Sequence, residues 1–346
     1  MARQAPVIYP DSPIQKEESM KPKVLVTRMI PHSGIELLET CCEVEVNAED
    51  RPLTRAELLD RVRDKAGVLG LMADRIDGEF FDAAPHLRGY ANYAVGYDNI
   101  DVAEATKRRI PVANTPGVLT DATAELAWAL LFAVARRVVE LDQIMRSGQW
   151  GGWGPMQFLG ADVCGKTLGI VGAGRIGTAM ALMSKGFRMP VLYANASGRR
   201  NEVLEKELGA RLVSVEELLE RSDYVSLHAP LTPQSRHLFN ANTLARMKKT
   251  AILINTSRGP LIKEDDLVHA LKTGQLSGAG LDVYEFEPRM AEGLAALPNT
   301  VLLPHVGSAT ETTRTNMAIL AARNLLAMLR NERPETCLNP EVLPQG

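Results

Sequence analysis

The sequence predicts an α/β protein built from two doubly wound parallel-sheet domains. Short apolar segments alternate with amphipathic segments over most of the 346 residues, and strands that alternate with helices on this scale form parallel βαβ units. The chain is too long for one ordinary compact domain and long enough for two hydrophobic cores. A glycine-rich turn follows an apolar strand near the middle of the chain, at 165–177, and predicts that one domain binds a phosphate group.

The composition is that of a globular protein, and its charge balance favours a small-molecule partner. The 39 lysine and arginine residues nearly balance the 42 acidic residues, and a net charge of -3 gives no general attraction for nucleic acid or an anionic membrane. No apolar run is long enough to cross a bilayer, and the N-terminus lacks the features of a secretory signal, so we expect a cytoplasmic protein. The four cysteines, at 41, 42, 164 and 337, show no paired spacing, so no metal site is predicted.

The first domain is expected to start near residue 20. Residues 1–19 are polar, contain prolines and show no periodicity, so we predict a mobile tail. The segment KVLVT at 23–27 predicts a buried strand, and Thr54 is a candidate N-cap for a helix at 54–63. The same alternation predicts further strands at 42–46, 67–71, 87–91 and 112–113, and helices at 32–39, 79–84 and 102–107.

A long apolar helix is predicted at 122–147, after a threonine and an aspartate that suit its N-terminus. It is hydrophobic on more than one face. We therefore expect it to be clamped between the two domains and to offer a surface to a second copy of the chain. A loop with Trp150, Trp153 and Pro155 follows it.

The second domain is predicted to follow as a doubly wound sheet. Its strands are expected at 167–171, 191–193, 224–227, 251–255, 278–282 and 300–302, and its helices at 176–187, 201–208, 215–220, 243–246 and 263–272. A last long helix at 310–331 should return to the first domain, because the glycine-rich turn lies mid-chain. The predicted architecture is a Rossmann dinucleotide-binding domain, residues 120–309, inserted into a discontinuous flavodoxin-like substrate domain, residues 20–119 and 310–346.

The turn VGAGRIG, at 171–177, has the spacing of a dinucleotide fingerprint. Gly172 permits a tight turn, Gly174 lets the backbone approach a pyrophosphate, and Gly177 lets the helix pack closely on the strand. The free N–H groups at the start of the helix, at Arg175 and Ile176, favour the phosphates. Glycine-rich turns also join strands to helices for structural reasons alone, but the strand before this turn and the helix after it favour cofactor binding.

Polar residues stand at the carboxyl ends of predicted strands in the second domain, where open α/β sheets bind ligands. Arg258 can hold a substrate carboxylate through two hydrogen bonds. The imidazole of His305 is suited to donate a proton to an oxygen that gains negative charge, and Glu287 can accept a hydrogen bond from that imidazole and favour its protonated form. Each residue alone has an ordinary structural explanation, but the three together beside a nicotinamide form a complete apparatus for carbonyl reduction.

Five ordered motifs resemble those of the D-isomer-specific 2-hydroxyacid dehydrogenases, most closely the glyoxylate/hydroxypyruvate reductases. They are TPGVLTDATAELAWAL (115–130), the glycine turn, NTSRGPLI (255–262), LDVYEFEP (281–288) and PHVGSAT (304–310), and the likeness runs from about residue 23 to 339. The resemblance implies that Arg258 clamps the substrate carboxylate, that His305 donates or accepts the proton, and that Glu287 orients His305.

The same resemblance implies the remaining parts of the site. The turn VGYDNID (95–101) should present the N–H groups of Val95 and Gly96 to the substrate, with Leu71 and its neighbours to residue 74 lining the same pocket. Trp153 should reach the active site of the partner subunit in a homodimer, and packing within its own chain is a close alternative. Cofactor contacts are implied for Thr123, His228, Pro230, Thr256 and Asp282, the last beside the nicotinamide carboxamide.

The loop after the second strand of the nucleotide domain favours NADP(H) over NAD(H). NAD-dependent members of the family carry an acidic residue about twenty positions past the glycine motif, and this chain has VLYANASGRR (191–200) there. Asn195, Ser197, Arg199 and Arg200 could instead bind a 2′-phosphate, with charge-assisted hydrogen bonds from the arginines. NAD(H) stays open, because Ala196 stands where NADPH-using relatives often place an arginine.

The predicted function is reduction of a small 2-oxo acid, glyoxylate or hydroxypyruvate, to its 2-hydroxy acid by hydride transfer from the nicotinamide. Closure of the cleft between the domains is expected to exclude water. Phosphite and longer D-2-hydroxy acids are alternative substrates. A dinucleotide-sensing interaction protein of the corepressor type is an alternative of another class, since such proteins keep the same fold and the same triad.

Overall fold

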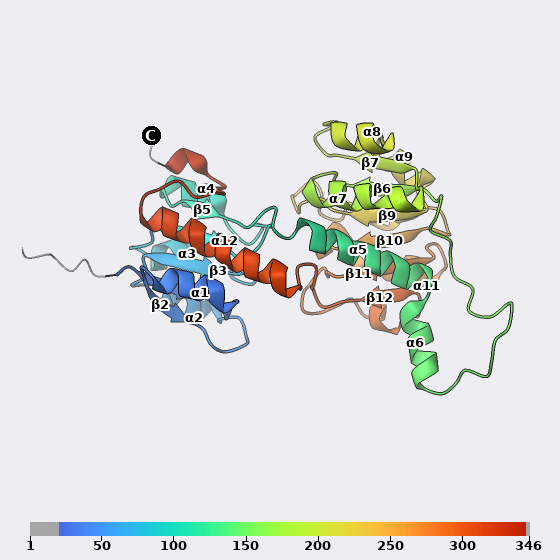
Figure 1. Ribbon diagram of the computed structural model, residues 1–346, viewed down its shortest axis with the longest axis horizontal. Coiled ribbons are helices and arrows are strands. Elements are labelled where there is room, and N and C mark those ends of the chain that lie inside the picture. The colour runs from blue at the N-terminus through green and yellow to red at the C-terminus, as the bar shows by residue number, and fades with distance from the viewer. Residues whose placement is uncertain (1–20, 344–346) are drawn as a thin grey trace, which may run out of the picture.

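The computed structural model describes residues 21–343 and contains two α/β units, each built on one parallel sheet (Figure 1). The tail predicted at 1–19 lies outside the described residues. The first sheet has the strand order β2-β1-β3-β4-β5. Its strands are β1 (Lys23–Val26), β2 (Glu43–Val46), β3 (Gly67–Gly70), β4 (Gly89–Asn92) and β5 (Val112–Ala113), joined by α1 (His32–Glu39), α2 (Arg55–Arg61), α3 (Gly78–Ala83) and α4 (Val102–Lys107).

The second sheet is larger, with the strand order β12-β11-β10-β9-β6-β7-β8, and it too is parallel throughout. Its strands are β6 (Leu168–Val171), β7 (Val191–Ala194), β8 (Arg211–Leu212), β9 (Tyr224–Leu227), β10 (Ile252–Asn255), β11 (Gly278–Leu281) and β12 (Thr300–Leu302). The short edge strand β8 was not predicted. The helices that follow these strands are α7 (Arg175–Met183), α8 (Glu202–Leu208), α9 (Val215–Arg221), α10 (Ala241–Leu244) and α11 (Glu264–Lys272).

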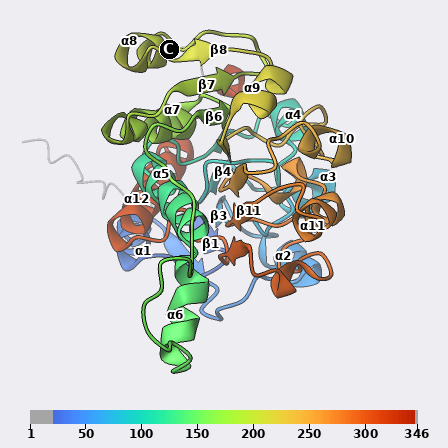
Figure 2. The same ribbon diagram turned by 90° about the vertical axis from the view of Figure 1, so that its right-hand side faces the viewer.

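Helices cover both faces of the second sheet, which confirms the predicted doubly wound fold. Figure 2 shows α5 and α7 on one side of the strands and α9, α10 and α11 on the other. Each side has its own apolar core: Leu131 and Met180 belong to the first, and Leu218 and Leu267 to the second. The central strands are buried on both faces, as expected for a parallel sheet sandwiched between helices.

The last helix, α12 (Glu311–Leu329), returns from the second sheet to the first and packs against α1, β3 and β4 (Figure 1). The contact with α1 is close, because a Cβ on Gly34 would lie 2.8 Å from the Cβ of Ala318. We propose 20–119 together with 310–346 as the substrate domain and 120–309 as the nucleotide domain, since α5 begins at Thr120 and α12 at Glu311.

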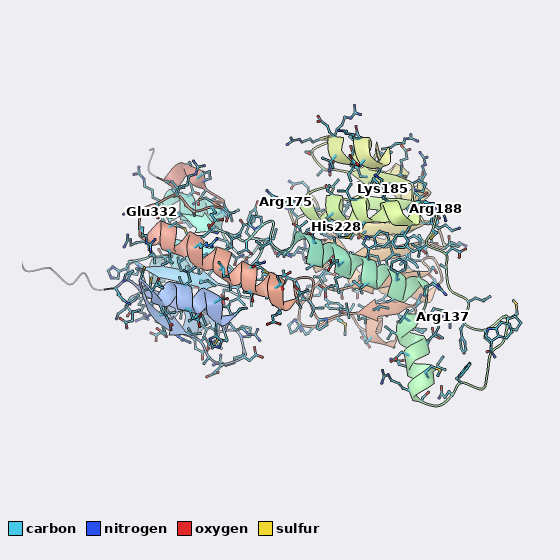
Figure 3. The ribbon with its side chains drawn as sticks, viewed as in Figure 1. Arg137, Arg175, Lys185, Arg188, His228 and Glu332 are labelled. Carbon is cyan, nitrogen blue, oxygen red and sulfur yellow. The ribbon has the colours of Figure 1, made fainter. Side chains whose placement is uncertain are left out.

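The single long helix predicted at 122–147 is wrong. The chain forms α5 (Thr120–Ala135) and α6 (Val138–Arg146), with Arg137 between them in a left-handed conformation at φ 55° (Figure 3). The carbonyl of Ala135 accepts a hydrogen bond from the returning backbone N–H of Ala161 at 2.7 Å, so a tertiary contact ends α5 where local pattern continues. The predicted position between the domains is also wrong, because α5 packs along β10, β11 and α7 of the second unit.

The other predicted helices and strands occur within a few residues of their expected places, and local chemistry explains many of their ends. Thr54 caps α2, as predicted, and also forms a capping box with Glu57. Asp77, Asp101 and Ser214 cap helices in the same manner, each accepting a backbone N–H three residues on. Within residues 21–343, no helix is both long and apolar enough to span a membrane, and no cluster of metal-ligating side chains occurs.

Candidate active site

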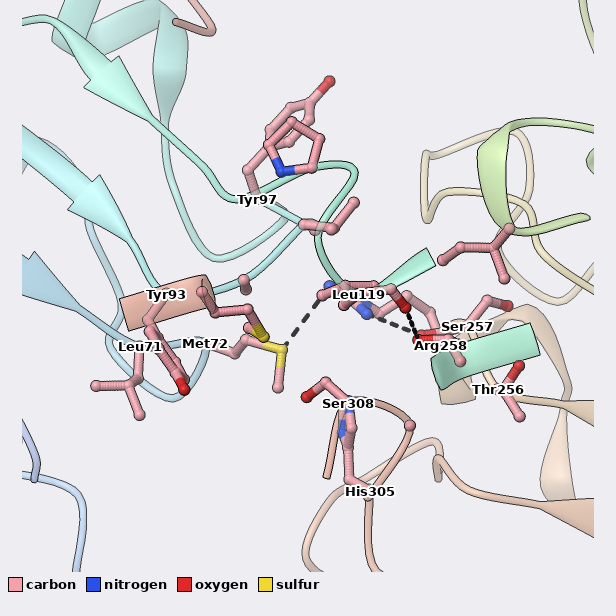
Figure 4. Close-up of a pocket in the computed structure, with 18 of the residues that line it drawn as sticks. Leu71, Met72, Tyr93, Tyr97, Leu119, Thr256, Ser257, Arg258, His305 and Ser308 are labelled. Carbon is pink, nitrogen blue, oxygen red and sulfur yellow. Dashed lines mark hydrogen bonds between the residues drawn. The ribbon is translucent and has the colours of Figure 1, made fainter. Parts of the chain in front are cut away.

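A cleft with a cavity volume of about 740 Å³ opens between the two sheets. Leu71, Val95 and Gly96 line it from the loops that follow β3 and β4. Arg258 and His305 line it from loops of the second unit (Figure 4). Both sets of loops follow the carboxyl ends of parallel strands, which is where open α/β sheets bind their ligands.

The three glycines of the turn after β6 have different surroundings. Gly172 has a φ of 93°, which L side chains rarely adopt. A Cβ on Gly177 would lie 2.3 Å from the carbonyl oxygen of Gly172, so this glycine lets α7 pack against the turn. A Cβ on Gly174 would meet no atom of the described chain within 4 Å. The open space at Gly174, at the N-terminus of α7, therefore fits a bound pyrophosphate rather than a packing demand of the protein.

Arg258 follows β10 and reaches across the cleft to the first unit. Its Nε donates to Asp98 Oδ1 at 2.8 Å, and its Nη1 donates to the Ser257 carbonyl at 2.8 Å. The guanidinium rests against Gly96, because a Cβ there would lie 1.5 Å from Nη2. Among the described residues the one hydrogen-bond acceptor near Nη2 is the sulfur of Met72, at 4.0 Å (Figure 4). The Nη end of the guanidinium is therefore the end that can donate to a ligand carboxylate.

His305 and Glu287 form a hydrogen-bonded pair beside the cleft. His305 Nδ1 lies 2.9 Å from Glu287 Oε2, while Glu287 Oε1 accepts the backbone N–H of Tyr284 at 3.1 Å. Burial raises the pKa of the Glu287 carboxyl, but the hydrogen bond and the charge of His305 outweigh burial and leave this pKa below its usual value. With the carboxylate on Nδ1, the Nε2 atom is left to exchange a proton with a ligand.

Asp282, at the end of β11, holds the loop that carries His305. Its carbonyl accepts the His305 N–H at 2.9 Å, and its carboxylate oxygens accept the N–H groups of Val306 and Gly307 at 2.7 Å each. The side chain is fully buried, and burial raises the pKa of its carboxyl. These contacts keep His305 at φ 54°, a left-handed conformation that a non-glycine residue keeps only when its surroundings impose it.

Two buried polar atoms of residues that line the cleft have no hydrogen-bond partner in the described chain: His228 Nδ1 and Thr256 Oγ1. The other ring nitrogen of His228 lies 2.9 Å from Ser226 Oγ. Burial lowers the pKa of His228 to about 4, so this imidazole is neutral at pH 7. An unpaired buried polar atom is costly, so both atoms fit hydrogen bonds to a polar ligand, and a neutral imidazole does not repel a positively charged nicotinamide.

Comparison with known proteins agrees with this geometry. The model of the NAD-binding domain of D-isomer specific 2-hydroxyacid dehydrogenases matches residues 128–307. The glyoxylate reductase of Thermococcus kodakarensis is 53% identical over 328 residues, which cover 94% of this chain and 98% of that protein. This chain belongs to the D-isomer-specific 2-hydroxyacid dehydrogenases. A second glyoxylate reductase, from Pyrococcus horikoshii, is 52% identical to this dehydrogenase over the same shares of the two chains.

Solved structures of related proteins extend over almost the whole dehydrogenase. A protein of Thermus thermophilus superposes with a TM-score of 0.85 at 47% identity, covering 91% of this chain and 99% of that one. The NADPH-dependent glyoxylate/hydroxypyruvate reductase of Sinorhizobium meliloti, solved with NADP and malonate, superposes with a TM-score of 0.83 at 32% identity, covering 94% and 99%. The family prediction is confirmed, and with it a nicotinamide dinucleotide as the cofactor.

Most of the site residues predicted for this dehydrogenase converge on the one cleft, and Figure 3 shows Arg175 and His228 on the side of the second unit that looks toward the first. Glu287 contacts the cleft through His305, and Gly172 and Gly177 shape the turn. The predicted residues that line the cleft are Leu71, Val95, Gly96, Thr123, Gly174, Arg175, Ile176, His228, Pro230, Thr256, Arg258, Asp282 and His305.

The loop after β7 lies outside the residues that line the cleft. Asn195 Oδ1 accepts the Ala173 N–H at 2.8 Å, so this side chain braces the glycine turn. Ser197 Oγ accepts the Arg199 N–H at 3.3 Å. Arg200 forms an ion pair with Glu205 of α8, which occupies part of the guanidinium that the sequence assigned to a 2′-phosphate.

Trp153 is 84% exposed on the loop after α6 and does not line the cleft of its own chain. Packing of Trp153 in the groove between the domains of its own chain is therefore wrong.

Sequence reasoning missed Asp98, which pairs with Arg258 over a separation of 160 residues. It also missed Arg28 and Arg314, which line the cleft from the ends of β1 and α12. The acid inside VGYDNID was the available signal for Asp98, because a carboxylate beside a substrate loop invites an arginine partner.

Proposed function

We propose that this dehydrogenase reduces glyoxylate or hydroxypyruvate to the corresponding 2-hydroxy acid with a reduced nicotinamide cofactor. The observation that carries the proposal is the convergence of Arg258 and the His305–Glu287 pair on one cleft with the open glycine turn. The names of the glyoxylate reductases that are 53% and 52% identical to this chain support the choice of substrate.

The chain's own residues supply binding, orientation and a proton. The Nη end of Arg258 binds the substrate carboxylate, and its charge draws electron density from the neighbouring carbonyl. The reduced nicotinamide supplies a hydride to the carbonyl carbon when it is bound. His305 donates the Nε2 proton to the carbonyl oxygen as negative charge develops there, and Glu287 stabilises the imidazolium before transfer and fixes the orientation of the ring.

The test is a steady-state assay of the purified protein with NADPH and NADH against glyoxylate, hydroxypyruvate and longer 2-oxo acids, with phosphite and NADP⁺ in a parallel reaction. Substantial turnover of glyoxylate or hydroxypyruvate, lost in His305→Ala, is the expected result. Efficient turnover of phosphite or of a longer acid alone would replace the substrate. No turnover of any of them would favour the dinucleotide-sensing alternative.

For the cofactor we propose a preference for NADP(H), with NAD(H) as the weaker substrate. The end of β7 carries Ala194 and Asn195 in place of an acid, so no carboxylate there repels a 2′-phosphate. Arg199 and Ser197 lie on the exposed loop that follows. Arg200 offers less than the sequence alone suggested, because Glu205 already pairs with it. A ratio of kcat/KM values that favours NADH would contradict the preference.

We propose a homodimer in which α6 and the loop after it are covered by the second copy. This segment exposes Val138, Val139, Met145, Trp153 and Met156, an apolar surface that is costly to leave in water. In the dimer Trp153 would contact the partner's site. A monomeric mass in solution would contradict the dimer, and an unaltered preference among oxo acids in Trp153→Ala would contradict the contact.

A further inference from the structure

The cleft wall of the first unit consists of two loops that follow neighbouring strands. The loop after β3 contributes Leu71, Met72 and Ala73, and the loop after β4 contributes Val95 and Gly96. Backbone hydrogen bonds fix the start of the two loops, from the Tyr93 N–H to the Gly70 carbonyl at 2.8 Å, and close a turn from the Asp74 N–H to the Leu71 carbonyl at 3.1 Å. Among the described residues none of these backbone bonds joins Val95 or Gly96 to the Leu71 loop, so side chains must hold that part of the wall at a fixed separation. Three polar side chains behind the wall do so without lining the cleft themselves: Asp74, Asn92 and Asn99.

Asn99 bridges the two loops. Its Nδ2 donates to the carbonyl of Leu71 at 3.2 Å and to the carbonyl of Asp74 at 3.0 Å, which are the two ends of the first loop. Its own carbonyl accepts the N–H of Ile76 at 2.9 Å. Its Oδ1 lies 3.4 Å from Asn92 Nδ2, which also donates to the carbonyl of Gly96 at 2.9 Å. One amide thus connects the Leu71 loop to the Gly96 loop.

The surroundings make this connection stiff. Asn92 is fully buried and Asp74 is 4% exposed. The Asp74 carboxylate accepts the Leu71 N–H at 2.8 Å, which closes the first loop on itself, and the Thr27 hydroxyl at 2.5 Å, which ties that loop to the end of β1. Asn99 itself is half-buried, between these two buried side chains. Its hydrogen bonds therefore compete with less water than bonds at the surface, and the loss of one partner leaves buried groups unsatisfied.

We infer that Asn99 is a positioning residue for the substrate. It acts by holding the Leu71 loop and the Gly96 loop at a fixed separation in the cleft wall. The inference rests on the proposed function, because it takes the backbone N–H groups of Val95 and Gly96 as the site of a 2-oxo acid carboxylate. Asn99 touches neither substrate nor cofactor. Its effect is transmitted through the carbonyls of Leu71, Asp74 and, by way of Asn92, Gly96.

The expected signature is a split between KM and kcat. The wall contacts the acid in the ground state and in the transition state alike, and loss of such uniform binding raises KM with little change in kcat. A purely structural role would act differently: partial unfolding lowers the concentration of active enzyme, which reduces the apparent kcat and leaves KM unchanged.

Asn339 provides a matched control in the same unit. It is 1% exposed, its Nδ2 donates to the Ile110 carbonyl at 2.9 Å and to Thr106 Oγ1 at 3.1 Å, and its Oδ1 accepts the Val112 N–H at 2.9 Å. Asn339→Ala therefore removes a similar set of side-chain hydrogen bonds away from the cleft, from a more deeply buried position than that of Asn99. It should lower the denaturation midpoint at least as much as Asn99→Ala does and leave KM for the acid unchanged.

The experiment measures kcat, KM for glyoxylate and hydroxypyruvate, KM for NADPH and the urea midpoint in the wild type, Asn99→Ala, Asn99→Asp and Asn339→Ala. We expect KM for the acid to rise about tenfold or more in both Asn99 variants, with KM for NADPH within about twofold of the wild type. Asn99→Asp keeps the shape but turns an oxygen toward the carbonyls of Leu71 and Asp74, so it should not rescue binding.

Two failures can be told apart. An unchanged KM in Asn99→Ala, or an equal rise in Asn339→Ala, overturns the role of Asn99 while the wild-type activity stands. A wild type that turns over none of the 2-oxo acids overturns the proposed function and the inference with it.

Discussion

Gly96 offers a one-methyl test of how Arg258 is placed. The glycine is not needed for its backbone conformation, because its φ lies outside the left-handed region. It is needed for space: a Cβ would stand 1.5 Å from Nη2 and 2.5 Å from Cζ of Arg258, and 3.1 Å from Asp98 Oδ1. Gly96→Ala should therefore displace the guanidinium and leave the rest of the first sheet intact.

The size of the effect follows from the contact distance. Ordinary van der Waals contact begins at 3.4 Å, so Nη2 must retreat by about 2 Å. A hydrogen bond does not survive such a shift, since its donor and acceptor must lie about 2.7–3.2 Å apart. A hydrogen bond to a charged group contributes about 1.5–3 kcal/mol, which corresponds to a loss of about 10- to 150-fold in kcat/KM for the oxo acid.

The assay compares kcat/KM for glyoxylate in the wild type, Gly96→Ala and Gly186→Ala, with thermal unfolding recorded for each. A Cβ on Gly186 would meet no described atom within 4 Å, so this variant controls for the added methyl group. KM for the cofactor should stay unchanged in both variants. If Gly96→Ala retained wild-type kcat/KM, the assignment of the Nη end of Arg258 to the substrate carboxylate would be refuted.

Three further predictions concern the catalytic pair, the phosphate turn and a helix cap. Glu287→Gln removes the carboxylate that orients the His305 ring and stabilises the imidazolium, so kcat for reduction should fall with little change in KM for the oxo acid, and an unchanged kcat would contradict the role of Glu287. The pKa of Glu287 is lower in the folded state than in the unfolded state. Its contribution to stability is therefore present above the unfolded-state pKa and is lost as pH falls through the folded-state pKa. The urea midpoints of the wild type and Glu287→Gln should accordingly converge in acid. The added methyl group of Gly174→Ala has room in the protein, so this variant should keep the wild-type melting temperature. Its KM for NADPH should rise about tenfold or more, because the methyl group occupies the space for the pyrophosphate. A lower melting temperature with a normal KM would mean that this glycine serves only the structure. Thr54→Ala removes the cap of α2 and should cost about 1 kcal/mol in urea unfolding with kcat unchanged; no loss of stability would mean that the capping box contributes nothing.

Local patterns predicted most of the elements and the motif residues, apart from the division of 122–147 into α5 and α6 and the edge strand β8. Apolar runs such as 168–171 and 252–255 predict buried parallel strands because helices cover both faces of the sheet. Motifs at the ends of such strands then meet at one edge of the sheet, because parallel strands share a direction. For this reason Arg258, Asp282 and His305 line a single cleft although they lie far apart in the sequence.

Contacts between distant segments decided the rest. Local pattern continues through Arg137, whereas in the structure Arg137 is left-handed and the Ala135 carbonyl accepts a hydrogen bond from the distant Ala161. The ion pair with Glu205 leaves Arg200 less free to bind a phosphate, and the sequence of the loop after β7 does not reveal this pair.

The sequence by itself determined the α/β class and the glycine turn, since each depends on neighbours within a few positions, and it predicted Arg258, Glu287 and His305 as candidate catalytic residues. Only the tertiary structure showed that Asp98 holds Arg258 and that Asn99 joins the two substrate loops. The physical reason is that a hydrogen bond depends on where its donor and acceptor stand in space, and side chains from different loops acquire that relation only after the sheets have formed.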